Sequence, residues 1–203
     1  MIQVIKIHPV GFAANTYFLT VDGKSVVCID PAQPRVYREA EKHGLEVKYV
    51  LLTHGHFDHI GGCAALQEAG AKIGCLSGEE RLAILDNLSD SFGGGLEIAP
   101  FSVDFTVRDG EILDICGMKI KVIASAGHTA GGACYLADGC LFTGDTLFRG
   151  SVGRCDLPTG NMETLEKSVR RLYALEGDYA VYAGHGEDTT LEEERRNNGV
   201  IRA

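Results

Sequence analysis

Three of the chain's seven histidines fall within six positions, in the segment H-G-H-F-D-H at residues 54–59. The segment follows an almost continuous apolar run, which is typical of a buried strand. On extended backbone His54 and His56 point to the same side, whereas Asp58 and His59 begin the next predicted helix and point elsewhere. Imidazole and carboxylate groups are ligands for zinc, iron and manganese. The segment therefore predicts two adjacent sets of metal ligands, in preference to a polar surface loop.

Three further candidate ligands, His128, Asp145 and His185, each follow a predicted strand and stand beside glycine. Taken alone, each of these residues is weak evidence for a metal site. A lone loop histidine is at best as often a ligand as not, and an isolated Gly-Asp is usually a turn. Together with the 54–59 segment, however, four strands end in a potential ligand. Sites in layered α/β folds collect at such strand ends. His8 and His43 fit no such pattern, and we interpret them as structural or surface residues.

The predicted secondary structure that must position these candidate ligands alternates between short strands and short helices. Strands are expected at Gln3–Ile7, Thr16–Val21, Ser25–Ile29, Val47–Leu52, Lys72–Leu76, Val103–Val107, Ile112–Ile115, Lys119–Ala124, Ala133–Ala137, Cys140–Phe142 and Tyr179–Ala183. Helices are expected at Arg35–His43, Asp58–Ala69, Glu79–Leu88 and Met162–Leu175, with a last helix from the Thr190 capping box through Arg196. We expect one α/β domain over residues 1–203, with two sheets face to face and helices outside. Composition alone does not separate this from other α/β layerings.

Composition excludes several classes of function. A net charge of −9 and a pI near 5.2 disfavour a nucleic-acid partner. No apolar stretch approaches the ~18 residues of a membrane span, and the N-terminus resembles a strand more than a signal peptide. The seven cysteines are odd in number and form no C-x-x-C pair, so we expect buried, reduced thiols. These observations predict a cytoplasmic protein with a small-molecule substrate and no membrane partner, as a monomer or small homo-oligomer.

Four motifs in fixed order carry a specific resemblance: T-H-G-H-F-D-H, G-H-T-A-G-G, G-D-T-L-F-R-G-S-V-G-R-C-D-L-P and A-G-H-G-E-D-T-T. In this order they resemble the metallo-β-lactamase superfamily across essentially the whole chain, and within it the small glyoxalase II-like (hydroxyacylglutathione hydrolase-like) proteins. The resemblance implies a four-layer αββα sandwich with two divalent metal ions at one edge, zinc first and iron or manganese as alternatives. It implies one metal on His54, His56 and His128, a second on Asp58, His59 and His185, and Asp145 as a bridge.

The implied activity is hydrolysis of a thioester such as S-lactoylglutathione. Two cations lower the pKa of a shared water, so that hydroxide can attack a polarised carbonyl at neutral pH. Asp58 is predicted to be catalytic as well, by orienting that water or carrying its proton. Arg154 matches the basic residue that contacts the glutathione carboxylate in the glyoxalase II family, and Arg149 is nearby. A surface ion pair is an equally good interpretation of both arginines.

Two differences from the glyoxalase II family leave the substrate less certain than the type of reaction. The full-length glyoxalase II enzymes continue into a C-terminal helical domain that is not seen here, and Asp156 stands where they have an aromatic residue. Hydrolysis is therefore better supported than glutathione specificity. A persulfide dioxygenase with one iron on two histidines and an aspartate, a lactonase or phosphodiesterase, and a non-catalytic metal-binding module are the alternatives. β-Lactamase action is disfavoured, because the subclasses with a cysteine ligand place it at the position of Asp145. The glycine-rich loop Ser89–Pro100 is a candidate lid.

Overall fold

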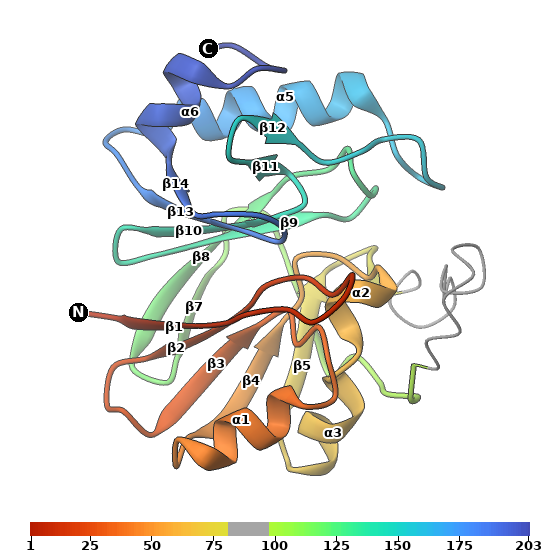
Figure 1. The fold of residues 1–203 in the computed structure, drawn as a ribbon, viewed down its shortest axis with the longest axis vertical. Helices are drawn as coiled ribbons and strands as arrows, with labels where there is room; N and C mark the ends of the chain where they lie inside the picture. The colour runs from red at the N-terminus through yellow and green to blue at the C-terminus, as the bar shows by residue number, and fades with distance from the viewer. Residues whose placement is uncertain (81–97) are drawn as a thin grey trace.

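In a computed structural model that describes residues 1–80 and 98–203, the chain forms four layers (Figure 1). Two six-stranded sheets face each other, in the orders β1-β2-β3-β4-β5-β6 and β14-β13-β10-β9-β8-β7. The first sheet consists of β1 (Gln3–Ile7), β2 (Thr16–Thr20), β3 (Ser25–Ile29), β4 (Glu46–Leu51), β5 (Lys72–Leu76) and β6 (Phe105–Val107). The second consists of β7 (Ile112–Ile115), β8 (Met118–Ala124), β9 (Ala133–Ala137), β10 (Cys140–Gly144), β13 (Ala180–Ala183) and β14 (Thr189–Thr190).

Helices cover the outer face of each sheet (Figure 1). The helices α1 (Val36–Lys42), α2 (Phe57–Ile60) and α3 (Cys63–Glu68) follow strands of the first sheet, and α5 (Met162–Tyr173) and α6 (Leu191–Asn197) lie beyond the second. A short hairpin, β11 (Leu147–Phe148) with β12 (Ser151–Val152), sits near α5. This arrangement confirms the predicted αββα sandwich.

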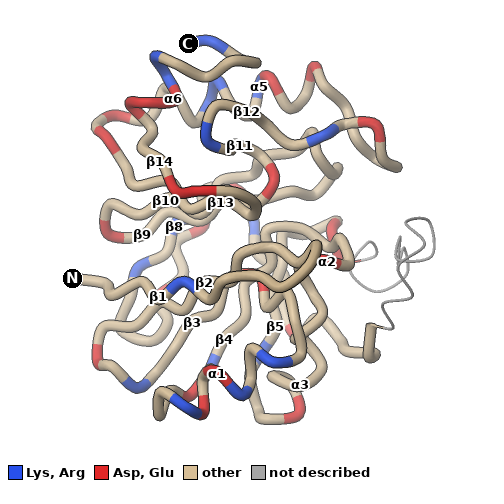
Figure 2. The backbone as a smooth tube through the Cα atoms, viewed as in Figure 1, with Lys and Arg blue, Asp and Glu red and all other residues tan. Residues whose placement is uncertain are grey.

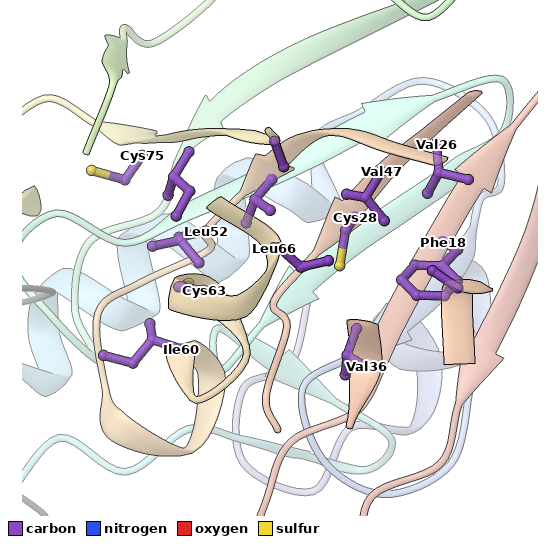
Figure 3. Close-up of a cluster of buried hydrophobic side chains, with 14 residues drawn as sticks. Phe18, Val26, Cys28, Val36, Val47, Leu52, Ile60, Cys63, Leu66 and Cys75 are labelled. Atoms are coloured by element: carbon purple, nitrogen blue, oxygen red, sulfur yellow. The ribbon is translucent and has the colours of Figure 1, made fainter. Parts of the chain in front are cut away.

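Strand alternation divides the hydrophobic residues among three cores. In β2, Phe18 faces the layer of α1 and α3, whereas its neighbours Tyr17 and Leu19 face the second sheet. Figure 3 shows the first of these cores, in which Phe18 and Cys28 pack with residues of the outer helices. The third core joins the second sheet to α5 and α6. All seven cysteines are free and four of them are buried, as the sequence predicted for reduced thiols.

Parallel pairing brings the ligand-bearing strand ends to one edge. In the first sheet Ile29 pairs with Leu51, so β3 and β4 end side by side. In the second sheet β10 runs parallel to β13. The backbone N–H of Ala133 donates to Thr53 O at 2.8 Å and so joins the second sheet to the end of β4. The carboxyl ends of strands from both sheets therefore meet along a common edge.

The predicted helix Asp58–Ala69 is wrong as a single helix, because it breaks at Gly61 and Gly62 into α2 and α3. The Gly62 N–H donates to Pro31 O at 2.6 Å instead of to Asp58 O, which accepts from Ala14 N at 3.0 Å. A Cβ atom on Gly62 would lie 2.6 Å from the Gln33 carbonyl oxygen. The two glycines therefore allow the chain after β3 to pack directly against the break.

Several smaller differences separate prediction from structure. Neither β14 nor the β11–β12 hairpin was predicted. The predicted helix Glu79–Leu88 and loop Ser89–Pro100 lie mainly outside the described residues. Thr190 is the N-cap of the last helix, because its Oγ1 accepts from Glu193 N at 3.2 Å. Within 1–80 and 98–203, no helix has the length and apolar character needed to cross a bilayer.

Candidate metal centre

All seven side chains predicted as metal ligands meet at the shared edge of the two sheets. They fall into two triads that share no member, plus a third group that links them. In each group the candidate ligand atoms lie within 4.8 Å of one another. The first triad is His54, His56 and His128; the second triad is Asp58, His59 and His185; the linking group is His54, His59 and Asp145.

Asp145 lies between the two triads. Its Oδ1 is 3.3 Å from His59 Nε2 in the second triad. Its Oδ2 is 3.6 Å from His128 Nε2 in the first triad and 3.6 Å from His185 Nε2 in the second. One carboxylate thus faces ligands of both sets, which is the geometry that a bridging ligand requires.

Four buried polar atoms at this centre have no hydrogen-bond partner among residues 1–80 and 98–203: His54 Nε2, His56 Nε2, His59 Nε2 and Asp145 Oδ1. A buried polar atom without a partner costs about 1–3 kcal/mol, so such a cluster needs an explanation. His56 Nδ1 also lies only 2.8 Å from His128 Nε2. Nitrogens and carboxylate oxygens that converge in this way suit divalent cations, which accept electron pairs from all of them. The residues therefore fit a two-metal site.

The electrostatics of His56 and Asp145 favour the protonation states that bind metal. Burial and, after it, the neighbouring imidazoles of His128 and His59 lower the pKa of His56 to about 4. Burial raises the pKa of Asp145, but the imidazoles around it, His59 first, outweigh burial and hold that pKa below its usual range. A neutral imidazole and an ionised carboxylate are the forms that coordinate a cation.

A residue that the sequence analysis missed, Asp30, orients one of the ligands. Asp30 follows β3 with a positive φ of 49°, and its side chain is buried. Its Oδ2 accepts from His59 Nδ1 at 2.8 Å and from Thr53 Oγ1 at 2.6 Å, and its Oδ1 accepts from Thr53 N at 2.7 Å. Binding Nδ1 in this way turns His59 Nε2 toward the centre. A signal was available, because Asp30 directly follows the predicted strand Ser25–Ile29.

Two further imidazoles are held through Nδ1. His128 Nδ1 donates to the backbone oxygen of Arg154 at 2.7 Å. The Thr53 hydroxyl, whose hydrogen goes to Asp30, lies 3.1 Å from His54 Nδ1 and can accept from it. In both cases Nε2 remains free to act as the ligand atom.

Glycines allow the backbone to approach the ligands closely, as the G-H-G and G-D motifs suggested. A Cβ atom on Gly184 would lie 2.3 Å from Asp145 Oδ1 and 2.8 Å from His59 Cε1. Gly144 has a φ of 46°, and its Cβ would lie 2.2 Å from Thr53 Oγ1. Any larger residue at either position would displace a member of the centre.

The two arginines predicted to bind substrate lie in surface ion pairs. The Arg154 guanidinium donates to both oxygens of Asp156 at 2.7 Å, and this pairing lowers the pKa of Asp156 to about 2. Arg149 pairs with Glu187. Figure 2 shows basic and acidic segments interspersed around α5, β11 and β12. A role in substrate binding stays a prediction for both arginines.

Comparison with known proteins places the chain in a family. The family model of the metallo-beta-lactamase superfamily matches residues 9–185. The chain belongs to this superfamily. It is 36% identical to the hydroxyacylglutathione hydrolase GloC of Haemophilus influenzae over 207 residues, which cover 97% of each protein.

Two solved structures are similar over almost their full length. BLEG-1, a B3 metallo-beta-lactamase, has a TM-score of 0.89 at 28% identity and covers 100% of each chain. TTHA1623, solved in a di-iron-bound form, has a TM-score of 0.84 at 31% identity, covering 98% of this chain and 100% of its own. The family and GloC support a metal-dependent hydrolase.

Proposed function

We propose that this chain is a two-metal hydrolase that cleaves small thioesters, S-lactoylglutathione or a close analogue. The observation that carries the proposal is the pair of triads with Asp145 between them. The Asp145 carboxylate oxygens lie 3.3–3.6 Å from imidazole nitrogens of both triads. The similarity to GloC supports the thioester as the bond that is cleaved. A thiolate needs little protonation to leave, which suits a site rich in ligands and poor in free acids.

Two divalent ions held by the triads would supply an activated water and polarise the substrate carbonyl. We propose zinc as the metal, with iron or manganese as alternatives; the di-iron form of TTHA1623 keeps iron prominent among them. The chain's own contribution is to fix the imidazoles through Asp30, Thr53 and the Arg154 carbonyl. This fixes the ligand atoms before substrate arrives, so little reorganisation is needed during turnover.

Asp58 is the proposed proton carrier of the site. Its side chain is 18% exposed and its Oδ2 lies 3.2 Å from His185 Nε2. Burial raises the pKa of Asp58, but the neighbouring His59 and the hydrogen bond from His185 bring it below its usual value. Asp58 is thus an ionised acceptor with access to solvent, as a residue that orients a water or relays its proton must be.

For substrate binding we propose Arg154 and Arg149 as contacts to an anionic thiol. A carboxylate on the thiol would compete with Asp156 for the Arg154 guanidinium. Because such exposed pairs contribute little to stability, an incoming carboxylate can replace the Asp156 side chain. The proposed partners are accordingly small anionic thioesters and not nucleic acids.

A substrate panel on metal-analysed protein tests the proposal. The panel contains a glutathione thioester, a neutral thioester, a lactone, a phosphodiester and a β-lactam, the last because of the similarity to BLEG-1. We expect about two metals per chain and the highest kcat/KM for a thioester. A single iron per chain, with oxygen uptake on glutathione persulfide and no thioester turnover, would overturn it.

That contrary result would fit a persulfide dioxygenase, the second candidate. The observation in its favour is the group His54, His59 and Asp145, whose ligand atoms lie within 4.8 Å of one another. Two histidines and one carboxylate form the set that holds non-haem iron in oxygenases. The remaining four ligands would then have no role, which is why the hydrolase is proposed first.

A further inference from the structure

Glu79 is a buried carboxylate outside both triads. It stands shortly after β5 and is only 2% exposed. Its Oε1 accepts from the backbone N–H of Gly55 at 3.0 Å, and its Oε2 accepts from the backbone N–H of Gly131 at 2.9 Å. Glutamate is rarely buried to this extent unless its oxygens are satisfied, and here both are.

The two N–H groups belong to the loops that carry the first triad. Gly55 lies between His54 and His56, and Gly131 lies three residues after His128. A single carboxylate therefore ties the loop after β4 to the loop between β8 and β9. Asp30 does the corresponding work for His59 in the second triad and reaches the first triad only through Thr53, so each triad has a direct support of its own.

Close packing makes this link specific. A Cβ atom on Gly131 would lie 2.5 Å from Glu79 Oε2 and 2.8 Å from Glu79 Cβ. Only glycine at 131 lets the backbone come close enough to donate. Burial raises the pKa of Glu79, and the bonds from Gly55 and Gly131 act in the opposite direction. Charge-assisted bonds of this kind are about twice as strong as neutral ones, so a carboxylate fixes the loop spacing better than a neutral acceptor.

We propose that Glu79 is a positioning residue that sets the spacing between His54, His56 and His128, and so sets the metal affinity of the first triad. The inference rests on the proposed two-metal site but not on the proposed substrate. Glu79 accepts bonds from the backbone of Gly55 and Gly131, and it acts on the first triad through them. Loss of a support of this type costs on the order of 10–100-fold in metal affinity.

The test compares Glu79→Gln with Glu80→Gln as a matched control. Both remove one negative charge at adjacent positions, but Glu80 Oε2 accepts from Gly78 N at 2.6 Å, within its own turn and away from the triads. Zn²⁺ is titrated into the metal-free full chain against a chromogenic chelator, and the two affinities are fitted. We expect Glu79→Gln to weaken one affinity by about 10–100-fold and Glu80→Gln to leave both unchanged. Equal affinities in the two variants would overturn the proposal.

Double variants show which of the two triads loses metal affinity in Glu79→Gln. In a His185→Ala background, which removes a ligand of the second triad, Glu79→Gln should still weaken the remaining site. In a His128→Ala background, the effect of Glu79→Gln should largely disappear, because the first triad is already broken. The reverse pattern would show that Glu79 supports the second triad and would contradict the proposal.

Gly131→Ala provides a variant that keeps the charge. Its added methyl pushes the same carboxylate away, so it should reproduce the selective loss of affinity. If Glu79→Gln does not fold, Gly131→Ala decides the question, and wild-type Zn²⁺ affinities in Gly131→Ala would overturn the proposal. Lack of thioester turnover in the wild-type chain would count against the proposed substrate only, because the titration uses metal alone.

Discussion

The two triads differ in how far they are enclosed. The first triad is buried throughout, since His54, His56 and His128 are between 2% and 4% exposed. In the second triad His59 is fully buried, but the side chains of Asp58 and His185 are 18% and 36% exposed. The first triad is therefore the fixed side of the centre. The second is the side that faces solvent, where substrate and water can reach the site.

The more buried triad is also the one that is held by more contacts. Glu79 and the Arg154 carbonyl hold the first triad from two different loops. In the second triad Asp30 holds His59, while Asp58 and His185 lie against each other at 3.2 Å. A preorganised half and an accessible half suit a reaction in which one side holds the centre together and the other receives reactants. The following predictions test this division, from the largest effect to the smallest.

The largest effect is expected from Asp145→Ala, which removes the residue common to both halves. Thioester turnover should fall to background, because both metal positions lose a ligand, while the far-ultraviolet circular dichroism stays close to wild type. Steady-state kinetics and metal analysis measure the change. Asp114→Ala, at an exposed position in β7, is the control and should retain full activity. Turnover that survives in Asp145→Ala would remove its bridging role.

Next in size is the contrast between His128→Ala and His185→Ala. Each should retain about one metal per chain, but the ion left on the first triad in His185→Ala should be held more tightly, because that triad is buried and clamped from two loops. Competition with a chelator measures both affinities. If His128→Ala holds its remaining ion as tightly as His185→Ala does, the proposed division between fixed and open halves is wrong.

Asp30→Asn should produce a smaller effect that is stronger at the second triad than at the first, because Asp30 bonds His59 directly and reaches His54 only through Thr53. The amide can still accept one hydrogen bond but loses the charge that orients His59, so we expect roughly 10–100-fold weaker metal binding there. This pattern is the mirror image of the one expected for Glu79→Gln. A metal titration of the two variants side by side checks it, and identical profiles would mean that the two supports are not separate.

The smallest effect is expected from Arg154→Ala and Asp156→Ala, which change the surface ion pair beside the metal centre. Because the Arg154–Asp156 pair is exposed, each change should alter KM only a few-fold and leave kcat unchanged. Arg154→Ala should raise KM for an anionic thioester, and Asp156→Ala should lower it by removing a carboxylate that competes for the guanidinium. A neutral thioester serves as the control substrate. Equal shifts for anionic and neutral substrates would remove the proposed contact.

Much of this molecule was predictable from local sequence. Strands such as Gln3–Ile7 and Lys72–Leu76 were placed at their observed bounds, because alternation and apolar runs are properties of a few neighbouring residues. The helix Asp58–Ala69 was not, because its break depends on the carbonyl of Pro31, which is remote in sequence. Periodicity describes the residues along an element, and it contains no information about which distant backbone will take a hydrogen bond.

The candidate metal centre likewise has features that local sequence predicts and features that depend on distant residues. The sequence was enough to predict the candidate ligands, their places at strand ends and, through the family's motifs, their grouping into two sets. What holds these side chains in place is seen only in the folded chain. Glu79 is 24 positions from Gly55 and 52 from Gly131, and Asp30 is 29 from His59. A buried carboxylate acquires its role from donors that the fold brings to it, and no local pattern distinguishes Glu79 from its partly buried neighbour Glu80.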